Sequence, residues 1–222
     1  MEPLTPQELD RLRAFDTPTI ANAIETFNVQ PRTAGFMNPD VKCMYPNLGV
    51  MLGYAMTARV RASVPNTASY SRHAWWDALA TAQTPSVVVI EDIDRPPVGA
   101  YWGEIQANIH GALGCAGTVT NGGVRDLREV EALGFQYFAG SVMVSHAYIE
   151  MLDFGTPVTV GGLTVSPGDL VHADLHGVQI IPLELARDIP AVCEKLAEKE
   201  RVIFALCQSP DFTLDKLKAI QQ

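Results

Sequence analysis

The sequence predicts an α/β fold, a layered α/β/β domain with a central mixed sheet and helices at both ends of the chain. Strand-like and helix-like segments alternate between residues 86 and 139, which is the pattern of a parallel sheet with crossover helices. Short apolar segments cut by glycine and proline follow over residues 157–182 and favour antiparallel or barrel-like packing. With 222 residues, 47% of them hydrophobic and 18% charged, the chain can bury the core of one domain.

Two helices are predicted near the N-terminus. Thr5-Pro6 and Thr17-Pro18 each place a hydroxyl side chain, which can cap a helix, before a proline suited to the first helical position. Residues 28–50 are rich in proline and glycine and are expected to form a long loop. Beyond this loop, Met51–Arg61 is typical of a strand and Thr67–Thr84 of a helix.

The middle and the end of the chain supply the remaining elements. In order, we expect a strand at Ser86–Ile93, a helix from Gly103-Glu104 to about Leu113, a strand at Cys115–Thr120, a turn at Asn121-Gly122-Gly123, a helix from near Asp126 to Leu133 and a strand at Phe135–Ala139. Residues 183–222 are expected to be helical with a break at Pro190. No composition shift marks an interdomain linker, so residues 1–222 are predicted to form a single domain.

Charge and cysteine content exclude several classes of protein. Acidic residues outnumber basic ones by 25 to 16, giving a net charge of −9, so neither a nucleic acid nor an anionic membrane surface is an expected partner. No segment approaches the roughly 18 consecutive apolar residues of a spanning helix, and the acidic N-terminus does not resemble a secretory signal. The four cysteines are scattered without a CxxC pair, as in reduced proteins. These observations together predict a cytoplasmic protein.

The distribution of lysine restricts the chemistry that the chain can perform. No lysine lies between Lys42 and Lys195, the stretch that contains the predicted strands and glycine-rich turns. Schiff-base catalysis needs a desolvated lysine in a pocket. Carbonyl chemistry by this protein is therefore expected to use a metal ion instead.

Candidate site residues follow the predicted strands, where ligands bind in open α/β sheets. One group is Gly103-Glu104 and the other is Asn121 to Asp126; both lead into helix N-termini, whose free amides and partial positive charge can hold an anion. Arg125 could bind a carboxylate through two hydrogen bonds or stabilise an oxyanion. The alternative is that it only forms a surface ion pair.

Two carboxylates of these groups could share one Mg²⁺, which takes few protein ligands and keeps several waters. For Glu104 the alternative is a favourable position at a helix N-terminus. Asp126 could instead cap its own helix in a D-x-x-E pattern with Glu129, and the local pattern favours this cap. His172 and His176, which flank Asp174, have a spacing that could bind metal, but we expect them at solvent-facing positions of a strand and turn.

The sequence at Gly103-Glu104 and at Gly122-Gly123-Val124-Arg125-Asp126-Leu127-Arg128-Glu129 resembles the RraA-like family. That family contains divalent-metal-dependent 4-hydroxy-4-methyl-2-oxoglutarate / 4-carboxy-4-hydroxy-2-oxoadipate aldolases and the regulator of ribonuclease activity. The similarity covers roughly residues 17–182 as a core, which leaves residues 183–222 as a C-terminal helical extension. The resemblance implies a swivelling-type domain that forms a homotrimer or homohexamer with sites at the subunit interfaces.

The resemblance also implies roles for individual residues. Asp126 matches the aspartate that ligates Mg²⁺ or Mn²⁺ directly, and Glu104 matches an acidic position that holds the metal through a water. Arg125 matches the catalytic arginine, which contacts the substrate oxygen at the scissile centre. Gly103, Ile105 and Gln106 match substrate-binding positions, the last two through backbone amides that receive the pyruvate carboxylate. His176 departs from the family, which often has an acidic or small residue there.

Three functions remain open at this point. The first is a metal-dependent aldolase that cleaves a 4-hydroxy-2-oxo acid to pyruvate and a carbonyl product, with oxaloacetate decarboxylation as a possible side activity. The second is a non-catalytic regulator that binds a ribonuclease or another protein; such a protein should have lost part of the Arg-Asp motif, which is intact here. The third is a relative acting on a sugar-derived 2-oxo acid, with Trp75-Trp76 and residues 28–50 lining its pocket.

Overall fold

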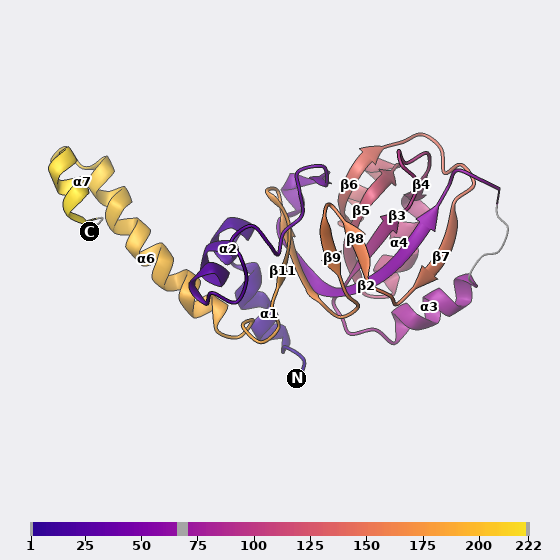
Figure 1. The fold of residues 1–222 in the computed structure, drawn as a ribbon, viewed down its shortest axis with the longest axis horizontal. Coiled ribbons are helices and arrows are strands. Elements are labelled where there is room, and N and C mark those ends of the chain that lie inside the picture. The colour runs from indigo at the N-terminus through magenta and orange to yellow at the C-terminus, as the bar shows by residue number, and fades with distance from the viewer. Residues whose placement is uncertain (1, 66–70, 221–222) are drawn as a thin grey trace.

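A computed structural model describes residues 2–65 and 71–220. Within these ranges the centre of the molecule is a nine-stranded mixed sheet with the order β1-β6-β5-β3-β2-β10-β11, in which β4 pairs with β5 and β7 with β2 (Figure 1). Its strands are β1 (Lys42–Cys43), β2 (Met51–Arg61), β3 (Ser86–Asp92), β4 (Ala100–Trp102), β5 (Cys115–Val124), β6 (Gln136–Val142), β7 (Glu150–Phe154), β10 (Leu170–Asp174) and β11 (Gly177–Ile181). The pairs among β2, β3, β5 and β6, and the β4–β5 pair, are parallel; the other pairs are antiparallel.

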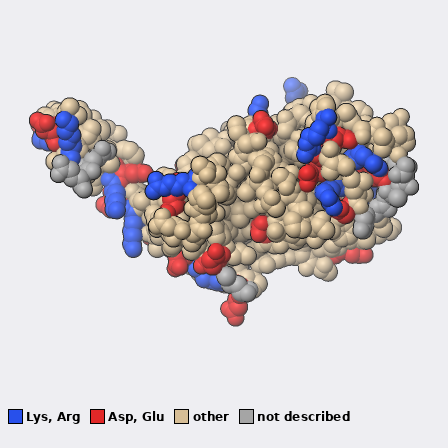
Figure 2. All heavy atoms as spheres, viewed as in Figure 1, with Lys and Arg blue, Asp and Glu red and all other residues tan. Residues whose placement is uncertain are grey.

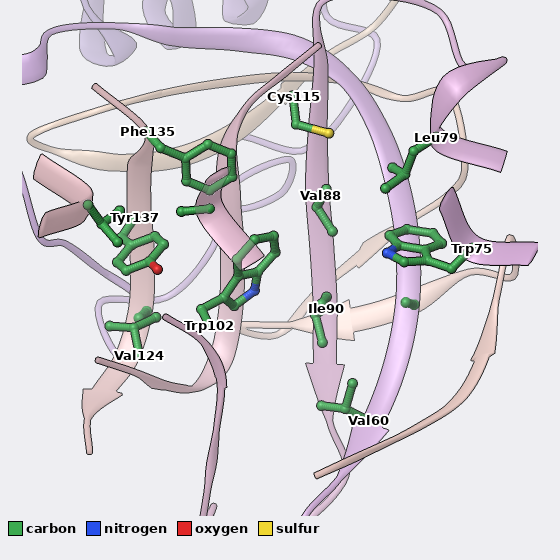
Figure 3. Close-up of a cluster of buried hydrophobic side chains, with 14 of the residues drawn as sticks. Val60, Trp75, Leu79, Val88, Ile90, Trp102, Cys115, Val124, Phe135 and Tyr137 are labelled. Atoms are coloured by element: carbon green, nitrogen blue, oxygen red, sulfur yellow. The ribbon is translucent and has the colours of Figure 1, made fainter. Parts of the chain in front are cut away.

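Helices cover one face of the sheet and a hairpin covers the other. The helices on the first face are α3 (Arg72–Ala80), α4 (Glu104–Ala112) and α5 (Leu127–Ala132), which bury Trp75, Ala107 and Val130 against the sheet. Figure 3 shows part of this core, with Trp102, Phe135 and Tyr137 packed together. The β8 (Val158–Val160) and β9 (Leu163–Val165) hairpin buries its valines on the opposite face. The predicted α/β/β layering is confirmed.

The remaining helices gather at the β11 edge. α1 (Pro6–Arg13), α2 (Thr17–Thr26) and the first turns of α6 (Ile189–Gln208) pack around Leu52 and Leu170. The rest of α6 and α7 (Leu214–Ile220) extends away from the body as an arm (Figure 1), and no residue from 194 to 220 is buried. No helix of the described ranges is long and apolar enough to cross a membrane.

Most of the predicted elements are present, with boundary corrections. The strand at Met51–Arg61 has the predicted bounds. The helix predicted at Thr67–Thr84 is α3, which spans only Arg72–Ala80, while residues 66–70 lie outside the described part. Residues 28–50 are mainly loop, as expected, but include β1 and a short 3-10 helix at Pro46–Leu48. Pro190 stands in the first turn of α6, where a missing amide costs nothing, and does not break the helix.

Two local predictions were wrong because distant contacts override the local pattern. Asp16 caps α2 through a bond from the Thr19 amide, whereas the Thr17 hydroxyl donates to Asp174 Oδ1 at 2.6 Å. The predicted turn at residues 121–123 is instead a continuation of β5, in which Gly123 lies opposite Ala100 of β4.

A buried histidine joins α3 to α4. The Trp75 indole N–H donates to His110 Nε2 at 2.9 Å, and His110 Nδ1 lies 2.7 Å from the carbonyl oxygen of Gln106. The imidazole is therefore neutral with its proton on Nδ1, since Nε2 accepts. Burial lowers the pKa of His110 to about 4, and the Gln106 carbonyl opposes this shift.

We expect His110 to make the protein sensitive to acid. Its pKa in the folded chain lies below the unfolded value of 6.5, so the unfolded chain binds the proton more readily. The free energy of unfolding should fall as the pH drops from about 6.5 to about 4. In urea titrations across this range, His110→Phe should show a weaker pH dependence than the wild type. The exposed His73→Phe is the control; equal slopes for His110→Phe and the wild type would contradict the assignment.

Candidate active site

The parallel strands β4 and β5 end side by side, and the predicted site residues follow them. We call this part of the sheet the corner. β4 ends at Trp102 and β5 at Val124, and these two residues are paired. The Arg125 amide continues the pairing by donating to the Trp102 carbonyl at 3.0 Å. Gly103 then leads into α4, and Asp126 into α5. The structure thus brings the two predicted groups together at the carboxyl edge of the sheet.

Asp126 caps α4 and not its own helix. The Asp126 side chain makes no capping bond to α5, so the D-x-x-E cap with Glu129 is not formed. Its Oδ2 instead accepts from the amide of Glu104 at 2.9 Å, which satisfies one free N–H at the start of α4. The backbone of Asp126 is left-handed, with φ 57° and ψ 46°, and this conformation turns the carboxylate back toward α4.

Arg125 and Asp126 form an accessible charged pair. Arg125 Nε lies 3.7 Å from Asp126 Oδ2, and the two side chains are 35% and 36% exposed. The guanidinium is neither buried nor used in another ion pair of the described residues. It is therefore free to meet an anionic ligand, while the aspartate can meet a cation.

Glycine is required at position 103 because the backbone there lies close to the side chains of Arg125 and Asp126. Its φ of −159° is open to any residue, but a Cβ there would lie 2.5 Å from Asp126 Oδ2 and 3.1 Å from Arg125 Nε. A side chain at this position would push the carboxylate away from the Glu104 amide.

The first turn of α4 offers donors to an anion. The Ala107 amide makes the first intrahelical bond, to Gly103, and no partner within residues 2–65 and 71–220 accepts from the Ile105 or Gln106 amides. The side chains of Glu104 and Ile105 are exposed. These two amides and the helix dipole can receive a carboxylate.

The residues present fit a hard divalent cation. The two candidate carboxylates are those of Asp126 and Glu104, and no group of three or more His, Cys, Asp or Glu in the described ranges could hold a metal. Mg²⁺ suits such a sparse set, because it keeps several waters and uses one or two carboxylates.

The alternative metal arrangement around Asp174 is not present. Asp174 Oδ2 accepts from the Thr17 amide at 2.8 Å, and Oδ1 accepts from the Thr17 hydroxyl and the His176 amide. His172 is fully buried, against our expectation of a solvent-facing residue, whereas His176 is exposed by about half. This aspartate joins α2 to β10, and both of its oxygens accept hydrogen bonds from the protein.

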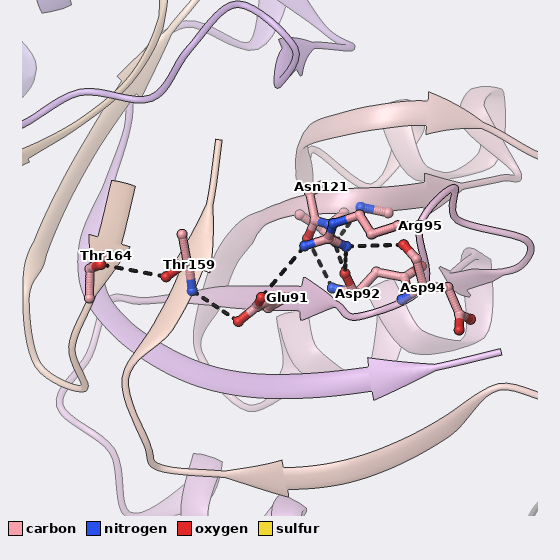
Figure 4. A network of polar contacts seen from close by, with 9 residues as sticks. Glu91, Asp92, Asp94, Arg95, Asn121, Thr159 and Thr164 are labelled. Carbon is pink, nitrogen blue, oxygen red and sulfur yellow. Dashed lines mark hydrogen bonds and ion pairs between the residues drawn. The ribbon is translucent and has the colours of Figure 1, made fainter. Parts of the chain in front are cut away.

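Asp92, the last residue of β3, and Asp94, two residues beyond it, stabilise the neighbouring backbone (Figure 4). Asp94 accepts from the Ala62 and Ser63 amides at 2.7 and 2.9 Å. The Asn121 side chain accepts from the Asp92 amide and donates to the Asp92 carbonyl, locking β3 to β5. Burial raises the pKa of Asp92 to about 6.

Sequence reasoning missed the aromatic residues that pack with Trp102. Tyr45 lies in the predicted loop, and Tyr137 was assigned only to a strand, yet both are buried in the same core cluster as Trp102. Their hydroxyls were not predictable, because nothing in the local pattern shows which residues α5 covers. Trp75 is buried and bonded to His110, so it does not line a substrate pocket.

The fold and this corner define an α/β protein with an arginine–aspartate pair set against a helix N-terminus. The family model for RraA-like proteins, described as Aldolase/RraA, matches residues 17–180, and the chain belongs to this family.

Individual relatives carry different names. A protein of Halalkalibacterium halodurans named "Putative 4-hydroxy-4-methyl-2-oxoglutarate aldolase" is 31% identical over 100 residues; the match spans 45% of this chain and 48% of that protein. A solved structure of an uncharacterized protein from Pseudomonas syringae has a TM-score of 0.77 at 24% identity and covers 98% of this chain and 95% of its own. Streptomyces coelicolor RraAS2, described as an unusual member of the RNase ES inhibitor RraA protein family, has a TM-score of 0.70 at 20% identity, covering 92% and 98%.

Replacing Gly103 with alanine should disrupt the corner. The added Cβ displaces the Asp126 carboxylate and removes the cap of α4, and we expect a loss of about 1–3 kcal/mol in the free energy of unfolding. The control is Gly111→Ala in the same helix, where the nearest atom to the new Cβ is 3.8 Å away and stability should hold or rise. Equal effects in urea titrations would show that close approach at Gly103 is unimportant.

Proposed function

We propose that this protein is a divalent-metal-dependent aldolase, a carbon–carbon lyase that cleaves a 4-hydroxy-2-oxo acid to pyruvate and a carbonyl product. The observation that carries the proposal is the Arg125–Asp126 pair held against the open first turn of α4. It offers an anion site, a cation ligand and an accessible positive charge within one corner. The aldolase name of the Halalkalibacterium relative agrees with it.

Asp126 would ligate Mg²⁺ or Mn²⁺, and Glu104 would hold the ion through a water molecule. When bound, the ion supplies a Lewis acid for the 2-oxo group. The Glu104 amide fixes one oxygen of Asp126, which leaves the other oxygen for the ion. The exposed Glu104 carboxylate adds negative charge at the same place.

The other residues would bind and orient the substrate. The Ile105 and Gln106 amides receive its carboxylate at the positive end of α4, and Gly103 leaves room for it. As the C3–C4 bond breaks, the 4-hydroxyl gives its proton to water and becomes the carbonyl of the second product, and the electron pair of the broken bond forms pyruvate enolate. The Arg125 guanidinium stabilises the negative charge on the enolate oxygen, and a proton taken up from water at C3 then gives pyruvate. Decarboxylation of oxaloacetate produces the same enolate, so we propose that activity as well.

The alternative function is a regulator that binds a ribonuclease or another protein, in line with the RNase ES inhibitor family to which the Streptomyces neighbour is assigned. The intact Arg125–Asp126 pair favours catalysis, since a binding protein has no need of it.

We also propose a homotrimer or homohexamer in the cytoplasm. The arm formed by α6 and α7 exposes large apolar side chains, namely Val202, Phe204, Phe212, Leu214 and Ile220. Its charged residues have both signs (Figure 2). Large apolar groups exposed on a projecting arm are typical of an interface, and a second copy of the chain would cover them.

A chelation experiment tests the proposal. Incubated with a panel of 4-hydroxy-2-oxo acids and oxaloacetate, the protein should release pyruvate, lose this activity in EDTA and regain it with Mg²⁺ or Mn²⁺. A coupled lactate dehydrogenase assay measures the pyruvate. Absence of release from every substrate with metal present would leave the regulator as the better account.

Substitutions in the corner should separate catalysis from metal binding. Arg125→Ala should lower turnover on the order of 10²–10³-fold with little change in metal affinity, as for loss of an oxyanion donor. Asp126→Asn should weaken Mn²⁺ binding measured by calorimetry. The exposed Arg128→Ala is the matched control. A folded Arg125→Ala protein with normal turnover would refute the catalytic role.

A further inference from the structure

A hollow lies between α2 and β11, at the β11 edge of the sheet. α2 and β11 contact each other and are seen side by side in Figure 1. We call this cavity the α2 hollow; it has a volume of about 170 Å³, and its lining includes Pro18, Ala21, Phe36, Met37, His176 and Gln179. Neither Arg125 nor Asp126 lines it, so the hollow is separate from the corner.

Asp174 fixes the side chain of His176 beside the hollow. His176 Nδ1 lies 3.1 Å from Asp174 Oδ1, and the His176 amide donates to the same oxygen at 2.8 Å. Burial alone would raise the pKa of Asp174, but the hydrogen bonds from Thr17 and His176 outweigh burial and lower that pKa, so the group is an anion. Because a carboxylate only accepts, the neutral imidazole carries its proton on Nδ1 and presents Nε2 as an acceptor.

The imidazole of His176 is not needed to hold Asp174. The Thr17 amide donates to Asp174 Oδ2 at 2.8 Å and the Thr17 hydroxyl to Oδ1 at 2.6 Å, so both oxygens have partners without it. The His176 side chain is 46% exposed, and no residue within 2–65 and 71–220 forms a hydrogen bond with its Nε2. This acceptor is therefore available to a molecule in the hollow.

The other walls of the hollow suit an aromatic ring. Pro18, Ala21, Phe36 and Met37 are apolar, and phenyl rings and thioethers make favourable contacts with aromatic groups. Phe36 is 48% exposed although its backbone is held in a β-bridge to Gln179. A cavity of about 150 Å³ can hold benzene, so the α2 hollow has room for one six-membered ring.

We propose that the α2 hollow is a second binding site, which takes a small aromatic molecule with a hydroxyl group, a phenol. The ring packs against Phe36 and Met37, and its O–H donates to His176 Nε2. A neutral phenol suits the site better than an aromatic carboxylate, because the Asp174 anion lies beside the imidazole and the chain carries a net charge of −9. Water alone would satisfy Nε2 but would leave the apolar walls hydrated.

The test compares phenol with toluene, which has the ring but no hydroxyl. Each is titrated into the full chain while the methyl NMR signal of Met37 is followed. Phenol should shift this signal and bind more tightly than toluene. His176→Phe keeps a ring but removes the acceptor, so it should weaken phenol binding roughly 2–10-fold and leave toluene binding unchanged. His73→Phe, at an exposed position outside the hollow, is the matched control and should bind both as the wild type does.

A second variant tests the location of the site. Ala21→Leu places a larger side chain in the hollow and should abolish binding of both molecules, with thermal melting as the check that each variant folds. If His176→Phe does not fold, this variant and the preference of the wild type for phenol decide the question. The inference is overturned if phenol leaves the Met37 signal of the wild type unchanged, as it would if a second copy of the chain covered the hollow. Equal phenol affinity of the wild type and a folded His176→Phe, or of the wild type and Ala21→Leu, would overturn it as well.

Discussion

The hydrogen bond from the Glu104 amide to Asp126 Oδ2 is the contact on which the candidate site depends. It joins the start of α4 to the start of α5 across 22 positions of sequence. It can form only because β4 and β5 end in register, because Gly103 has no side chain and because Asp126 adopts a left-handed backbone. Each condition belongs to a different part of the chain, so the corner is a property of the fold and not of one motif.

Electrostatics explain why the corner is placed at a helix N-terminus. The chain carries a net charge of −9, which would repel the proposed anionic 2-oxo acid at long range. Screening limits that repulsion to about 8–10 Å at physiological salt. Within that distance, the Arg125 guanidinium and the free amides of α4 supply positive charge. A local arrangement of this kind lets an acidic protein bind an acid without a basic surface.

The sequence predicted those parts of the fold that local patterns determine. Met51–Arg61 and α4 have continuous apolar or helical spacing, and their bounds were predicted closely. β4 was missed, since three residues show no periodicity. Asn121–Gly123 was predicted as a turn because of its two glycines. In the structure these glycines allow close packing of the strand, since a Cβ on Gly122 would lie 2.9 Å from Asp92. The candidate groups Gly103-Glu104 and Asn121 to Asp126 were predicted from their place after strands, and the family resemblance gave their roles, whereas the burial of Tyr45 and Tyr137 depends on tertiary contacts.

The backbone conformation of Asp126 departs from the one that its local D-x-x-E pattern predicts, and this departure has a free-energy cost. A left-handed conformation costs about 1–2 kcal/mol for most residues and less for aspartate, and α5 also loses its side-chain cap, worth about 0.5–2 kcal/mol. A cap on α4 of similar size offsets only part of this loss. Aspartate in an ordinary capping position would accept from an amide of α5. Here Oδ2 is fixed on α4 and lies 3.7 Å from Arg125 Nε, and we interpret the uncompensated strain as the cost of the ligand role proposed for this carboxylate.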